Sequence, residues 1–236
     1  MTRFLSSNRA AILLLFALGG CTWAFQGSNG EIPEMHKNLS RTVDIQTGVI
    51  QGDLAKAQAA AEWLLSRQDQ STLPPDAAVF EEEILGYASS ISTETELRAV
   101  AAQTGRIAAA CGSCHQATNG GPSFVVGTKN PTGDSQEAQM LRHLWAADRM
   151  WEGLVGPSDD AWMAGARAMA ETQPVLARAY RASVGTEQSE GFLAEVNRLA
   201  QEALTASDLP EKAEVYGQML DACNRCHTQA GIQVNR

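Results

Sequence analysis

The chain has 236 residues, of which 44% are hydrophobic and 6% aromatic, and its formal net charge is −9. This length suits one large domain or two of roughly 100 residues each, and the hydrophobic content is sufficient for a buried core. The negative charge argues against a nucleic-acid partner, because phosphates are bound by basic surfaces. We therefore expect a folded protein whose partners carry a basic docking surface.

Residues 1–20 have the pattern of an export signal. Arg3 and Arg9 flank its start, and the apolar run AAILLLFALGG follows them. The run is shorter than the about 20 residues that span a membrane. It ends in Leu-Gly-Gly-Cys, which resembles the lipobox of bacterial lipoproteins. The resemblance implies cleavage before Cys21, a lipid on its thiol and a place on the periplasmic side of a bacterial membrane. An ordinary signal peptide, giving a soluble periplasmic protein, or an uncleaved anchor stays open.

The first helical series is expected over residues 33–118, after a polar, glycine-containing tether at 21–32. Four helices fit its apolar periodicity. Asp53 is placed to cap the second helix, and two prolines precede a third helix that begins at about Asp76. Ser92 or Thr93 is placed to cap the fourth helix.

A second helical series is expected over residues 136–232. The segment 119–135 is rich in Gly, Pro, Asn and Thr and breaks the helical pattern, so we interpret it as a linker. Helices should then begin near Gln136, Ser158 and Gln188, with a fourth at the Leu-Pro-Glu of 209–211. No segment alternates with the period of a strand. The sequence therefore predicts an all-α fold of two tandem antiparallel four-helix bundles.

The two series can be superposed in sequence at an offset of 107 residues. This offset matches His36 with His143 and Asp53 with Asp160. Identity between the halves is low, and five extra residues are then needed before the last helix of the second half. The match predicts one architecture used twice.

The last helix of each series carries the same pentapeptide. Cys-Gly-Ser-Cys-His occupies 111–115, and Cys-Asn-Arg-Cys-His occupies 223–227. Cys-x-x-Cys-His is the attachment signature of c-type haem. Residues i, i+3 and i+4 share one helix face, so two thiols and an imidazole can reach one flat ligand. Two covalently bound haem c groups are therefore expected, attached at Cys111, Cys114, Cys223 and Cys226, with His115 and His227 as the proximal iron ligands.

Three other uses of the cysteines compete with haem. A Cys-x-x-Cys pair can be a redox dithiol, but that motif usually follows a strand in a βαβ unit. Two pairs can share one zinc ion, although the spacing here greatly exceeds common zinc spacings. Exported cysteines can also form structural disulfides. None of these uses requires a histidine directly after both pairs.

The position of the motif resembles one haem-protein family. In the cytochrome c-prime and cytochrome c-556 superfamily, the last helix of an antiparallel four-helix bundle carries Cys-x-x-Cys-His. The resemblance covers about 33–118 and 136–232, and it is specific only at the six pentapeptide residues. It implies haem in each bundle. A tandem arrangement departs from the usual single-domain member, so dimerisation and gas binding are not carried over.

The sixth iron ligand separates the functions that two haems could have, because an open iron site binds small ligands and a filled one mainly passes electrons. The two remaining histidines are His36 and His143, each on the first helix of its half. We expect both to point inward and to be the distal ligands. Met35 and Met140 are rival ligands, since related six-coordinate bundles use a first-helix methionine, and an open site is the third possibility.

The sequence thus predicts a dihaem c-type cytochrome that carries single electrons between redox partner proteins at the periplasmic membrane surface. Both haems are expected to be six-coordinate with two histidines, and no catalytic residues beyond haem are found. One alternative is a nitric oxide- or carbon monoxide-binding protein with an open haem site. Another is a dihaem peroxidase, although such proteins resemble longer chains with early motifs.

Overall fold

The computed structural model describes residues 31–67, 73, 75–122, 129–171, 181 and 185–231. Over these residues the chain is helical and contains no strand, which confirms the predicted all-α class. The predicted export signal, Cys21 and residues 22–30 of the tether lie outside the described residues. The α-helices are α1 (Glu31–Gln51), α2 (Leu54–Leu65), α3 (Ala78–Thr93), α4 (Leu97–Thr118), α5 (Gln136–Val155), α6 (Asp159–Ala170), α8 (Thr186–Thr205) and α9 (Leu209–Ala230), with a 3₁₀ turn at Pro75–Ala77.

Short polar side chains fix where four of these helices begin. Asp53, Ser135, Ser158 and Asp208 cap α2, α5, α6 and α9, and each accepts a hydrogen bond from the backbone N–H three residues later. Such a cap satisfies one of the N–H groups that has no partner in the first turn of a helix. The predicted role of Asp53 is confirmed.

The predicted cap of the fourth helix is wrong. Ser92 and Thr93 belong to the last turn of α3, where their hydroxyl groups donate back to backbone carbonyls of the preceding turn. The residue at the N-cap position of α4 is Glu96, and its side chain makes no capping hydrogen bond. The two hydroxyl groups therefore bond to carbonyl groups in the last turns of α3 and do not cap the N-terminus of α4.

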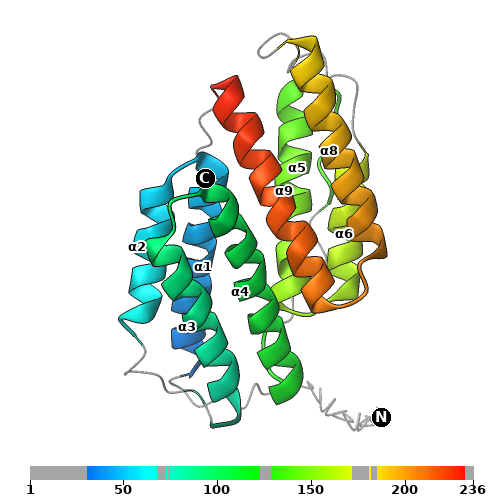
Figure 1. Cartoon of the computed structure of the whole chain (residues 1–236). Helices are drawn as coiled ribbons and strands as arrows, with labels where there is room; N and C mark the ends of the chain where they lie inside the picture. Colours follow the sequence, from blue (N-terminus) through cyan, green and yellow to red (C-terminus); the bar gives the residue numbers. More distant parts are fainter. Residues whose placement is uncertain are drawn as a thin grey trace, which may run out of the picture.

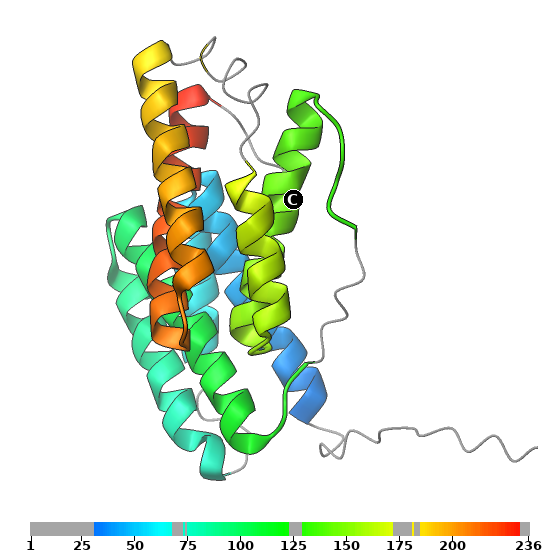
Figure 2. The same ribbon diagram turned by 90° about the vertical axis from the view of Figure 1, so that its right-hand side faces the viewer.

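The helices form two groups that meet at α4 and α9. Figure 1 shows α1, α2 and α3 on the left, α5, α6 and α8 on the right, and α4 beside α9 in the centre, running in opposite directions. In Figure 2, α4 ends near the bottom of the molecule and α5 begins near its top. The described part of 119–135 contains no helix.

Two glycines allow α4 and α9 to pack closely where they cross. A Cβ atom on Gly105 would lie 2.2 Å from the carbonyl oxygen of Ala213, and one on Gly217 would lie 2.9 Å from the Cα of Ala102. Small residues at a crossing let two helix backbones approach more closely than side chains otherwise permit. The two glycines are 112 residues apart, as are the first residues of α4 and α9.

The structure corrects the offset that relates the halves. α2 and α6 have equal lengths and lie 105 residues apart at both ends, whereas α4 and α9 lie 112 residues apart at both ends. Gly48 and Gly153, also 105 apart, each pack against the backbone N–H of an equivalent residue in the next helix. The offset of 107 is therefore wrong, and the second half has seven extra residues between α6 and α9.

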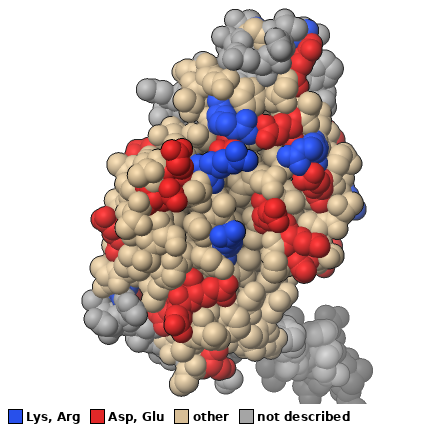
Figure 3. Space-filling view, in the orientation of Figure 1, with Lys and Arg blue, Asp and Glu red and all other residues tan. Residues whose placement is uncertain are grey.

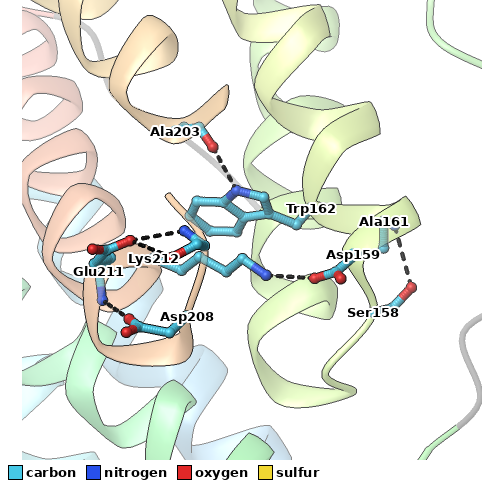
Figure 4. A network of polar contacts seen from close by, with 9 residues as sticks. Ser158, Asp159, Ala161, Trp162, Ala203, Asp208, Glu211 and Lys212 are labelled. Atoms are coloured by element: carbon cyan, nitrogen blue, oxygen red, sulfur yellow. Dashed lines mark hydrogen bonds and ion pairs between the residues drawn. The ribbon is translucent and has the colours of Figure 1, made fainter. Parts of the chain in front are cut away.

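A buried lysine joins α6 to α9 in the second half. Lys212 is 5% exposed, and its Nζ atom lies 2.5 Å from a carboxylate oxygen of Asp159. The same ammonium group lies 5.9 Å from the centre of the Trp162 ring, whose Nε1–H donates to the carbonyl of Ala203 in α8 (Figure 4). A desolvated cation over a tryptophan face is attracted by the ring's quadrupole. The contacts hold the ends of three helices together.

Charge is unevenly spread over the face seen in Figure 3. Acidic side chains occur over all of this face, and the basic side chains gather mainly in its upper half. Within the described residues, every helix is too short or too polar to cross a membrane.

Candidate functional site

The first pentapeptide forms the last two turns of α4. Cys111, Cys114 and His115 lie on one side of the helix, and all three side chains are partly buried. The helix ends at Thr118, and Asn119 follows in the left-handed conformation with φ 52°. The sequence prediction that this motif lies at the end of a helix is confirmed.

The ring of His115 is held between two segments from outside α4. Its Nδ1 atom lies 2.6 Å from the backbone carbonyl oxygen of Val155, at the end of α5. On the other side, a Cβ atom on Gly121 would lie 2.4 Å from the ring, and Gly121 has a φ of +95°. Both the close approach and the backbone angle require glycine at this position.

The second pentapeptide occupies the equivalent turns of α9. Cys223 and Cys226 are partly buried and His227 is buried. Gly231, with φ 63°, ends this helix as Asn119 ends α4. The Nδ1 atom of His227 lies 3.4 Å from the carbonyl oxygen of Ile50, at the end of α1.

These contacts determine the tautomer of both histidines. A backbone carbonyl only accepts hydrogen bonds, so the Nδ1 atom that faces it carries the proton. The neutral ring then has its lone pair on Nε2, which is the atom that can bind a metal. Metal-bound histidines commonly donate their other ring N–H in this way. The donor set therefore suits an iron at each pentapeptide.

The thiols of the first pentapeptide are poorly suited to redox exchange. Burial, together with the nearby Cys114, raises the pKa of Cys111 to about 12. Burial and the neighbouring Asp76 also raise the pKa of Cys114. Reactive dithiols have lowered pKa values and usually lie at helix N-termini, whereas these thiols lie at a C-terminus, where the helix dipole disfavours a thiolate.

A shared zinc site is also disfavoured. His115 and His227 each lie ten residues beyond the glycine at the α4–α9 crossing, which is about 15 Å along each helix. Because the helices run in opposite directions, the two pentapeptides are about 30 Å apart and cannot share an ion. The described residues contain no group of three or more His, Cys, Asp or Glu side chains suited to a metal ion. The four pentapeptide cysteines form no disulfide.

The two candidate distal histidines differ in their surroundings. His36 is exposed, so the expectation that it points inward is wrong. His143 is partly buried on α5, and its burial and the charge of nearby His227 lower its pKa to about 4. His143 therefore lies close to the proximal histidine of its own half.

The corrected offset also changes which first-helix residues correspond. At 105 residues, His143 matches Asn38 rather than His36. Met35 and Met140 do match at this offset, and both are partly buried. The methionines, not the histidines, are thus the repeated pair.

A groove of about 240 Å³ lies between α1 and α5. Its walls include Leu39, Val43, Arg149 and Trp151. The Nε–H of Arg149 and the Nε1–H of Trp151 are buried and have no acceptor among the described residues. Trp151 lies one helical turn from Val155, the residue that contacts His115. Two carboxylates, those of Asp148 and Glu152, also line the groove, and they disfavour an anionic ligand there.

Several of these site features carry no signal in the sequence. The carbonyls of Ile50 and Val155 belong to the backbone, so no residue type marks them. The groove donors belong to a tryptophan and an arginine, and both residue types also occur elsewhere in the chain. Gly121 was the one detectable feature, because it lies in a Gly-Gly-Pro turn directly after the motif helix.

Comparison of the chain with protein-family models, with curated proteins and with solved structures yields no match. The functional assignment therefore depends on the residues and their geometry.

Proposed function

We propose that the chain is a dihaem c-type cytochrome built from two tandem four-helix bundles, α1–α4 and α5–α9, in the cytochrome c-prime and c-556 superfamily. One haem is attached at Cys111 and Cys114, and the other at Cys223 and Cys226. The observation that carries this proposal is the repeated motif at the same turns of two equivalent helices, with the Nδ1 atom of each histidine facing a backbone carbonyl and Nε2 left for iron. When bound, haem supplies reversible one-electron chemistry.

The two haems are proposed to have different axial ligands. His143 lies close to His227, so it is the second ligand we assign to the haem of the second half. In the first half, Asn38 occupies the equivalent position and His36 is exposed. The haem of the first half is therefore left with Met35, which matches Met140, or with an open position.

The function proposed for this pair of haems is electron transfer between partner proteins. Acidic side chains over the face in Figure 3 favour a redox partner with a basic docking surface. Export and lipidation at Cys21 would hold the protein at the periplasmic side of the membrane.

A redox titration of the purified holoprotein tests electron transfer. We expect two reversible one-electron steps in the visible spectrum, with the haem of the second half at the lower potential. Imidazole donates more strongly to iron than a thioether and favours the ferric state, which explains that order. Turnover of peroxide with a reduced donor would instead favour a peroxidase, and the absence of reversible reduction would contradict electron transfer.

Small-ligand binding at the first haem is the second candidate function, because Asn38 cannot replace the histidine that the second half has. Carbon monoxide added to the reduced protein discriminates between small-ligand binding at the first haem and electron transfer alone. Binding at one haem, without displacement of a ligand, would favour an open first site. Absence of binding at either haem would favour two closed irons and electron transfer alone.

A further inference from the structure

The proximal histidine of each half contacts the other half of the chain. His115 on α4 donates its Nδ1–H to the carbonyl of Val155 on α5, and His227 on α9 does the same to Ile50 on α1. Ile50 and Val155 are 105 residues apart, the spacing that relates the first two helices of the halves. The same hydrogen bond, from a histidine of one half to a carbonyl of the other half, therefore occurs twice in the chain.

Close packing holds both carbonyls in place. A Cβ atom on Gly112, next to Cys111, would lie 2.2 Å from the carbonyl oxygen of Leu154 in α5. Its counterpart on α9 is Asn224, whose Nδ2 atom would lie 3.1 Å from a Cβ atom on Gly52, just after α1. The end of each first helix is therefore pressed against the motif helix of the other half.

We propose that each half supplies the backbone carbonyl that positions the proximal histidine of the other half, so that neither haem site is complete without both halves. The inference rests on the proposed function. The carbonyl fixes the ring orientation and the tautomer, and it makes the imidazole a stronger donor to iron. Stronger donation favours ferric iron and lowers the reduction potential of that haem.

The arrangement links the two haems through the protein. A change at the end of α1, in the first half, alters the hydrogen bond to His227 and with it the haem of the second half. A distortion that acts only within one half would alter the haem of that same half. The two possibilities can therefore be separated by asking which haem responds.

The full-length holoprotein with Gly52→Ala provides the test. Gly52 has φ +73°, so alanine strains the backbone two residues after Ile50. We expect the haem at Cys223 and Cys226 to shift to a higher reduction potential and to change its low-spin electron-paramagnetic signal. The reduction potential and the signal of the haem in the first half should stay unchanged. Gly86→Ala is the matched control in the first half, because its Cβ meets no atom within 4 Å.

A second measurement does not depend on any variant. In reduced wild-type holoprotein labelled with ¹⁵N-histidine, the Nδ1 protons of His115 and His227 should exchange slowly with solvent, because both are hydrogen-bonded inside the molecule. Exchange at the solvent rate would overturn the inference, as would a Gly52→Ala effect confined to the first haem. If haem is not attached at the motifs at all, the proposed function fails instead, so the two failures are distinguishable.

Discussion

His115 and His227 face backbone carbonyls with the same ring atom, although they lie in different halves of the chain. A carbonyl acceptor selects one tautomer and leaves the other nitrogen as a Lewis base. Beside each ring, two cysteines on the same helix side are placed to hold one flat group. Burial raises the pKa of the Cys111 thiol, which disfavours its thiolate form.

The distal histidine is testable by spectroscopy. We expect His143→Ala to remove the bis-histidine low-spin signal of one haem from the ferric electron-paramagnetic spectrum, because His143 lies close to His227. His36→Ala is the matched control, and it should leave the spectrum unchanged because His36 is exposed. A spectrum that His143→Ala does not alter would exclude this residue from the coordination of iron.

Residue identity predicted the positions of the two motifs at the ends of helices better than it predicted the surroundings of the candidate distal histidines. The two pentapeptides contain the thiols and the imidazole that the proposed haem attachment would use, so these motifs could be found without a structure. The stripe of His36, Leu39 and Val43 also has helical spacing, and Leu39 and Val43 do pack against the core. Periodicity gives the side of a helix, but it does not show where the neighbouring helices end, and His36 is exposed.

The antiparallel crossing of α4 and α9 dominates the arrangement of the elements. Gly105 and Gly217 place two backbones in direct contact, and both motifs lie on these helices. The crossing therefore fixes the position of each motif relative to the other half. Ends of α1 and α5 reach the motif helices only because the crossing is close.

We expect Gly217→Ala to lower the free energy of unfolding by about 1–3 kcal/mol, because the added methyl group would lie 2.9 Å from the Cα of Ala102. Gly86→Ala adds the same methyl group to an exposed turn of α3 and should raise stability by about 0.5–1 kcal/mol through helix propensity. Denaturant unfolding followed by circular dichroism measures both. Equal stabilities of the two variants would contradict the close crossing.

Helix positions were largely predictable from the sequence, whereas the relation between the halves was not. Asp53 and the prolines before α3 are strong local signals, and the helices begin near the predicted residues. The offset of 107 depended on matching two histidines and two aspartates by type. Ser158, not Asp160, proved to be the counterpart of Asp53, because serine caps a helix as well as aspartate does.

At the scale of the whole molecule, the two halves of the chain are arranged like the two subunits of a dimer. The two motifs lie at opposite ends, about 30 Å apart along α4 and α9. Each end nevertheless contains residues from both halves, which a sequence search for separate domains could not reveal. The two proposed haems would therefore lie at opposite ends, where each would meet a different partner, and the proposed contacts between the halves would link their potentials.

The mass of the intact protein, purified from a host that attaches haem, tests the central claim most directly. We predict that the wild-type chain carries the added mass of two haem groups after denaturation, because thioether bonds survive unfolding. Cys111→Ala with Cys114→Ala should remove one of them, and Cys223→Ala with Cys226→Ala the other. A denatured wild-type chain with no added haem mass would contradict the account.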